Sequence, residues 1–102
     1  MRKYKFKRGY KPTAERVEEA LITHFGSFEK KEDVYVVSYG AIREMRVWLD
    51  GKLLCVETET DTSVTNDVAT DTLKRFNKFL EDVTGYTAKE RRKQLQKEIE
   101  GK

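Results

Sequence analysis

The residues with the clearest potential for chemistry are lysines that alternate with aromatic residues near the start of the chain. Lys3, Lys5 and Lys7 occupy every second position, with Tyr4 and Phe6 between them. In a β-strand this period of two places the cations on one face and the rings on the other. If the rings face a helical layer, the lysines project from an open sheet face, where ammonium groups can contact phosphates.

A further basic residue and the single tryptophan are predicted on that same open face. Arg46 and Trp48 alternate with apolar residues in a strand of a central hairpin. Cations beside an aromatic ring suit single-stranded nucleic acid, because the cations follow the phosphates and a base stacks on the ring. Lysines that only keep a sheet soluble and its edges unpaired are the structural alternative. Glu44 and Glu57, predicted on this face, oppose binding. The predicted nucleic-acid contacts are Lys3, Lys5, Lys7, Arg46 and Trp48.

The same tryptophan supports a second class of function, a protein interface. Trp48 and Leu53 are predicted to face each other across the hairpin, and Ile42 and Cys55 would extend the apolar patch. Such a patch suits a partner protein or a second copy of the chain, together with a basic helix at the C-terminus. A cross-strand pair that only stabilises the sheet is the alternative. A small-ligand site between sheet and helices is a third hypothesis.

The chain has one histidine and one cysteine. A nucleophilic cysteine needs a base within reach. His24 falls on the core-facing stripe of a predicted helix, whereas Cys55 falls on the opposite face of the sheet, so the two should not meet. A structural role near the helix C-terminus is predicted for His24. P-loop, Cys-x-x-Cys and His-Glu-x-x-His motifs are absent from the sequence. We therefore expect a non-enzymatic protein without cofactor or metal.

An acidic segment, residues 57–71, contains five carboxylates and no basic residue. Clustered carboxylates can bind Mg²⁺ or Ca²⁺. However, Glu57, Glu59 and Asp61 alternate along a predicted strand, where same-face neighbours lie about 7 Å apart, and EF-hand spacing is absent. We interpret the segment as a solvated strand end that leads into a helix N-terminus.

These residues must be positioned by a small set of elements. A strand is predicted over residues 3–8, and a helix opens at Pro12 or Thr13 and ends at Gly26. Strands follow over residues 27–31, 33–39, 42–49 and 52–60, with Asp50-Gly51 as the loop of the last hairpin. A second helix is capped by Ser63 or Thr65 and ends near Thr84. A capping box, Thr87 to Glu90, opens a peripheral helix over residues 88–102.

The predicted hairpin loop sets the register of its two strands. It places Leu49 opposite Lys52 and Trp48 opposite Leu53. The predicted core face carries Met45, Val47, Leu49, Leu54 and Val56. The predicted open face carries Ile42, Glu44, Arg46, Trp48, Leu53, Cys55 and Glu57.

The element order β-α-β-β-β-β-α-α predicts the fold class. We expect an α+β two-layer sandwich, in which a mostly antiparallel five-stranded sheet has its helices on one face. At 102 residues the chain is expected to form a single domain, 1–102. Its charged fraction, 38% against a typical value of about 25%, fits a heat-adapted protein. A lone cysteine and the absence of a long apolar run predict a cytoplasmic location.

Four segments carry a resemblance to a known family: YKFKRGY at the start, HFG after the first helix, the hairpin WLDGKLLCVETET, and FLEDVTGYTAKERRK. Taken together, they resemble a small archaeal family of uncharacterised proteins. The resemblance implies a two-layer α/β sandwich like that of the TATA-binding protein, with an extra C-terminal helix. It implies no function, because such folds include DNA binders, small-ligand binders and protein adaptors.

Overall fold

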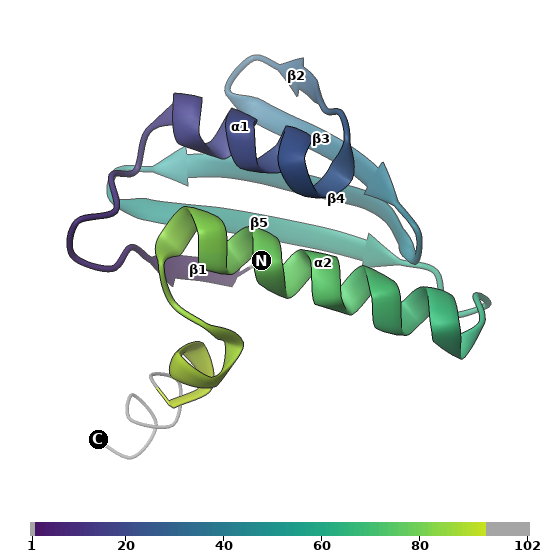
Figure 1. The fold of residues 1–102 in the computed structure, drawn as a ribbon. Helices are drawn as coiled ribbons and strands as arrows, with labels where there is room; N and C mark the ends of the chain where they lie inside the picture. The colour runs from purple at the N-terminus through teal and green to yellow at the C-terminus, as the bar shows by residue number, and fades with distance from the viewer. Residues whose placement is uncertain (1, 94–102) are drawn as a thin grey trace.

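The structure, a computed structural model, describes residues 2–93. Residues 88–93 are helical, and the remainder of the predicted C-terminal helix lies outside the described residues. Within residues 2–93, no helix combines the length and apolar character needed to cross a membrane. The elements, labelled in Figure 1, are β1 (Arg2–Lys5), α1 (Ala14–Phe25), β2 (Glu29–Lys31), β3 (Val34–Tyr39), β4 (Ile42–Asp50), β5 (Leu53–Thr60) and α2 (Asn66–Thr84).

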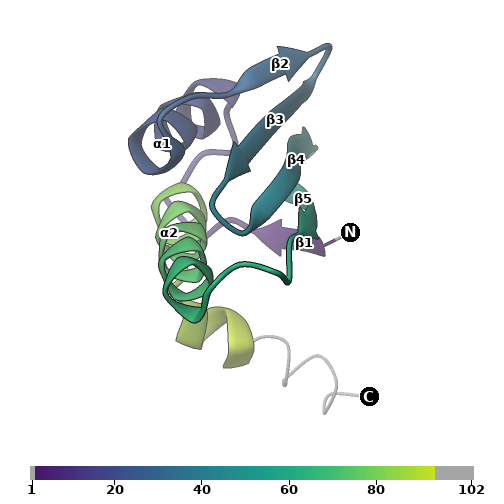
Figure 2. The ribbon, with the colours of Figure 1, turned by 90° about the vertical axis from the view of Figure 1, so that its right-hand side faces the viewer.

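The strands form one antiparallel sheet in the order β1-β5-β4-β3-β2. Both long helices lie on the same side of this sheet (Figure 2). None of the helices within residues 2–93 covers its other face, which we call the open face. The predicted fold class, an α+β two-layer sandwich with an antiparallel five-stranded sheet, is therefore confirmed. β1 and β2 are the edge strands, and β5 lies next to β1.

Local capping determines where the helices begin and end. The hydroxyl of Thr65 accepts a hydrogen bond from the backbone amide of Val68, and Gly85 ends α2 with a φ of 84°. The Thr87 hydroxyl accepts from the amide of Glu90, and the Glu90 carboxylate accepts from the amide of Thr87, both at 3.1 Å. This reciprocal pair is the predicted capping box.

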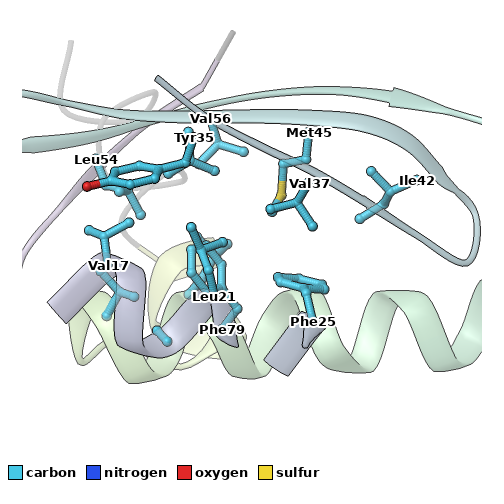
Figure 3. Close-up of a cluster of buried hydrophobic side chains, with 14 residues drawn as sticks. Val17, Leu21, Phe25, Tyr35, Val37, Ile42, Met45, Leu54, Val56 and Phe79 are labelled. Carbon is cyan, nitrogen blue, oxygen red and sulfur yellow. The ribbon is translucent and has the colours of Figure 1, made fainter. Parts of the chain in front are cut away.

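The core fills the space between the sheet and the two helices (Figure 3). Hydrophobic residues that recur every three or four positions on α1 and α2 meet the inward-facing residues of β3, β4 and β5. Tyr4 and Phe6 pack against this cluster from the edge, as their alternation with lysines predicts. Its members are Val17, Ala20, Leu21, Phe25, Tyr35, Val37, Ile42, Met45, Val47, Leu54, Val56, Phe79, Leu80 and Val83.

The hairpin register differs from the predicted one. Asp50 pairs with Leu53, so Gly51 and Lys52 are the two loop residues. Gly51 has a φ of +60°, whereas Lys52 has a negative φ, the pattern of a turn with glycine at its first central position. Each residue of β4 from Glu44 onward therefore pairs with the residue of β5 two positions beyond the predicted partner, so that Leu49 pairs with Leu54. From Glu44 onward the two faces keep their side chains, because a shift of two preserves the alternation.

The buried phenol of Tyr35 makes stability depend on alkaline pH. It donates a hydrogen bond to Glu18 Oε2 at 2.6 Å, and burial is the main cause that raises its pKa from 10.0 to about 12. Because the folded pKa is raised, this contribution to stability is complete below pH 10 and is lost as pH rises through 12. We expect Tyr35→Phe to flatten the decline in the free energy of unfolding between these pH values. Urea titrations across that range test this, and parallel curves for the two proteins would contradict it.

Candidate functional site

The open sheet face brings together only part of the predicted nucleic-acid site. Lys3 lies opposite Cys55, and Cys55 lies opposite Trp48, so the three residues form a row across β1, β5 and β4. Lys5 lies in the neighbouring row, opposite Leu53. Trp48 is half-buried, and the Lys3 ammonium is 3.6 Å from an Asp50 carboxylate oxygen. The predicted juxtaposition of these lysines with the tryptophan is present at the hairpin end of the sheet.

Lys7 lies elsewhere than predicted, because β1 ends at Lys5. The backbone amide of Lys7 donates to the carbonyl of Thr84 at 2.7 Å, which draws the chain toward the end of α2. Its ammonium group is 3.5 Å from Glu90 Oε2 and 5.8 Å from the ring centre of Tyr86. Lys7 therefore joins two segments of the helical layer and does not belong to the open-face set.

Arg46 is on the open face, but it is surrounded by carboxylates. Its guanidinium donates to Glu44 and Glu57, and Glu59 lies 4.0 Å away. The hydrogen bond from Arg46 holds the pKa of Glu57 below its usual value. Three carboxylates around one guanidinium leave this cluster with two net negative charges. Arg46 is therefore a poor phosphate contact, contrary to its predicted role.

The predicted protein-interface patch is not assembled. Ile42 is only 4% exposed and belongs to the core, not to the open face. The reason is an irregularity in the pairing of β4 with β5 between Ile42 and Glu44, where an extra residue reverses the alternation. Leu53 pairs with Asp50, so it is not opposite Trp48. Cys55 lies between Trp48 and Lys3 and is fully buried, so it offers no surface.

A groove at the edge of the sheet gathers more positive charge than the open face does. The groove has a volume of about 770 Å³ and lies between β1, α2 and the helical turn after Thr87. We call it the basic groove. Five of its lining residues are cationic, and none of the described lining residues is acidic. The cations are Arg2, Lys3, Lys5, Arg91 and Arg92, and the other lining residues are Tyr4, Leu53, Leu73, Phe76, Asn77, Leu80 and Ala88.

Packing holds the far wall of the basic groove in place. The Arg91 guanidinium donates to the carbonyl of Tyr86 at 2.6 Å and to Asn77 Oδ1 at 3.0 Å. It also lies 5.9 Å from the ring centre of Tyr4 on β1. Burial lowers the pKa of Arg91, while nearby Tyr4 and Glu81 act in the opposite direction. Arg91 therefore positions the helical turn against β1, and Arg92, which is exposed, extends the positive charge.

Sequence reasoning did not place Arg2, Arg91 and Arg92 at a common site. Arg2 shares with Tyr4 the helix-facing side of β1, where the groove lies, whereas Lys3 and Lys5 on the opposite face reach the groove because β1 is an edge strand. The basic run in the C-terminal helix was a visible signal. Its position next to β1 depends on how the chain turns after α2.

The groups considered for catalysis or metal binding have structural partners. His24 Nε2 lies 3.1 Å from Asp82 Oδ2, which links α1 to α2. Burial is the main cause that raises the pKa of the Cys55 thiol, the opposite of what activates a nucleophile. Asp61 accepts hydrogen bonds from the amide and hydroxyl of Ser63 before α2. Among residues 2–93, no cluster of three metal-ligating side chains occurs.

The fold and the basic groove define a class of protein: a small α+β two-layer domain with one open sheet face and a cationic edge. The chain belongs to the family described as domain of unknown function (DUF5611), whose profile matches residues 1–97. It is similar to the solution structure of a hypothetical protein from the archaeon Thermoplasma acidophilum, at 26% identity and a TM-score of 0.69, over 93% of this chain and 97% of that one. No curated protein gives a significant match. The predicted resemblance to an uncharacterised archaeal family is confirmed.

Proposed function

We propose that this domain is a non-catalytic binding module for single-stranded nucleic acid, and that the basic groove is its binding site. The single observation that carries the proposal is the set of five cations without a carboxylate among the described lining residues. The proposal moves the predicted site from the middle of the open face, where glutamates surround Arg46, to the edge of the sheet. Lys3 and Lys5 are common to both versions of the site.

The uncharged part of the groove favours a single strand over a rigid duplex. Tyr4 and Phe76 line the groove and are half-buried, so part of each residue is accessible from the groove. Base–aromatic stacking is tolerant of sequence and contributes about 1–3 kcal/mol per base. Unpaired bases can enter a groove of this size, whereas the bases of a duplex remain stacked inside its phosphate backbone. Trp48 lies in the same row as Lys3, two strands away, and would report an approaching strand through its fluorescence.

The proposal predicts a salt-dependent affinity with a defined slope. Arg2, Lys3, Lys5 and Arg92 would contact phosphates, with Lys3 exchanging its Asp50 partner for a phosphate, while Arg91 keeps its hydrogen bonds to Asn77 and Tyr86. Four contacts on a single strand correspond to a slope of about −3 in log affinity against log salt. We expect Lys5→Gln combined with Arg92→Gln to reduce the slope by about 1.4. Titrations of a mixed-sequence oligonucleotide, followed by Trp48 fluorescence from about 50 to 200 mM salt, measure it.

A matched control removes the same charge elsewhere. Lys74 and Lys78 are exposed on α2 and do not line the basic groove. Lys74→Gln combined with Lys78→Gln should lower the net charge equally and leave the slope unchanged. Equal slopes for the two double variants would refute the assigned site. A complete lack of association at low salt would refute nucleic-acid binding itself.

Three broader properties belong to the same proposal. We propose a TATA-binding-protein-like fold, supported by the two-layer arrangement and the open antiparallel sheet. We propose a cytoplasmic location, supported by the single, reduced and buried Cys55. Heat adaptation is supported by the charged fraction of 38%.

A further inference from the structure

β5 has a strand neighbour on both sides over only half of its length. β1 pairs with Leu53–Val56, whereas β4 pairs along the whole of β5 up to Thr60. In the part of the chain that the structure describes, residues 57–60 therefore have no strand on the β1 side. A strand edge of this kind presents backbone amide and carbonyl groups that can pair with another extended chain.

A second groove lies directly beside this open edge. Its volume is about 660 Å³, and it runs between β5 and the N-terminal half of α2. We call it the edge groove. Ile42 and Val56 line it from the sheet, and Ala69 lines it from the helix. It adjoins the basic groove, with which it shares Arg2, Tyr4, Leu73 and Phe76. Leu73 is 58% exposed, so the helix presents an apolar side chain that the domain itself leaves in water.

The charges next to the open edge are segregated by face. Glu57 and Glu59 lie on the open-face side of β5, within the cluster that has two net negative charges after pairing with Arg46. Thr58 and Thr60 alternate with them and line the edge groove on the helix side. A strand added here would thus meet carboxylates on one face and the apolar wall of α2 on the other.

We propose that the edge groove binds an extended segment of a partner protein, which adds an antiparallel strand to β5. The segment would alternate basic and apolar residues. Its basic side chains would lie opposite Glu57 and Glu59, and its apolar side chains would pack between Thr58 and Leu73. β1 already has this pattern, with Lys3 and Lys5 on the open face and Tyr4 toward the core. Strand addition beside a helix is a recurring mode of peptide recognition.

Charge and composition argue against other occupants. A nucleic acid would meet the net negative charge of the glutamate cluster. Pairing the β5 edges of two copies would bring Glu57 and Glu59 of each copy against those of the other, and like charges opposite each other are destabilising. The other edge strand of a second copy, β2, consists of Glu29, Lys30 and Lys31 and has no apolar residue for the groove. The proposed partner is therefore a different, basic and partly apolar chain.

The test uses the full isotope-labelled chain and a short blocked peptide in which valine and lysine alternate. Binding should shift the backbone amide resonances of residues 57–60 and slow their hydrogen exchange. Leu73→Lys should weaken binding by at least about tenfold, because a leucine side chain buried on binding is replaced by a charge. Ile22→Lys is the matched control, since Ile22 is a 54% exposed apolar residue on α1 outside the groove.

Four outcomes would overturn the proposal. The first is equal weakening by Leu73→Lys and Ile22→Lys. The second is a set of shifted resonances confined to Lys3, Lys5, Arg91 and Arg92, which line the basic groove and not the edge groove. The third is equal affinity for a peptide with glutamate in place of lysine. The fourth is a dimer in sedimentation velocity that Leu73→Lys dissociates, which would assign the edge groove to a second copy. Retained peptide binding in the Lys5→Gln and Arg92→Gln variant separates this site from the proposed nucleic-acid site.

Discussion

Phe79→Ala should lower the free energy of unfolding by about 3–5 kcal/mol. Phe79 is 0% exposed and lies at the centre of the core, between α1, α2 and the sheet (Figure 3). Its ring centre is 5.5 Å from that of Phe25 on α1. Truncation removes the ring from an apolar environment and leaves a cavity that two packed helices cannot fully close. Urea titration followed by circular dichroism measures the loss.

Control substitutions must show that the loss of stability comes from the position of Phe79 in the core, and not from any substitution in α2. Domains of this kind have a total stability of about 5–15 kcal/mol, so the alanine variant could be largely unfolded. Phe79→Leu keeps most of the volume, and we expect a smaller loss with a folded protein. Leu73→Ala on the exposed side of the same helix should change stability by no more than about 0.5 kcal/mol. A comparable loss at both positions would contradict the assignment of Phe79 to the core.

Gly40→Ala should lower the free energy of unfolding by about 2–4 kcal/mol, from strain and a broken hydrogen bond together. Gly40 has a φ of +50°, and an added Cβ would lie 2.2 Å from Thr72 Oγ1. That hydroxyl accepts a hydrogen bond from the Ala41 amide at 3.0 Å and donates to the Val68 carbonyl at 2.7 Å. The contact joins the β3–β4 turn to α2, so a displaced Thr72 leaves a buried amide without its partner.

A second glycine isolates the steric part of this effect. Gly51 has a φ of +60°, and an added Cβ there would have no atom within 4 Å. Gly51→Ala should therefore cost only the backbone strain of about 1–2 kcal/mol. In a Thr72→Ala protein the clashing hydroxyl is absent. Adding Gly40→Ala to that protein should therefore lower its free energy of unfolding further only by this backbone strain. Equal losses for Gly40→Ala and Gly51→Ala would show that the contact with Thr72 is unimportant.

The elements were predictable because their signals are local. The alternation around Tyr4, the stripe that ends at Phe25, the Thr65 cap and the capping box at Thr87 each lie within a few neighbouring residues. The faces of the hairpin were also correct from Glu44 onward, since alternation survives a register error of two. The partner of Trp48 and the burial of Ile42 were not predictable, because a turn type and one extra residue in β4 decided them.

By itself, the sequence determined the order of the elements, the face that most of them turn toward the core, and the two-layer fold class. Periodicity and helix caps are local signals, so they can be read from short stretches of sequence. The tertiary structure alone decided which charges compensate each other. Register brought Glu57 and Glu59 to Arg46, and the turn after α2 brought Arg91 and Arg92 to β1. Electrostatic interactions depend on distance through space, and distances between residues far apart in the chain are set only when the layers pack.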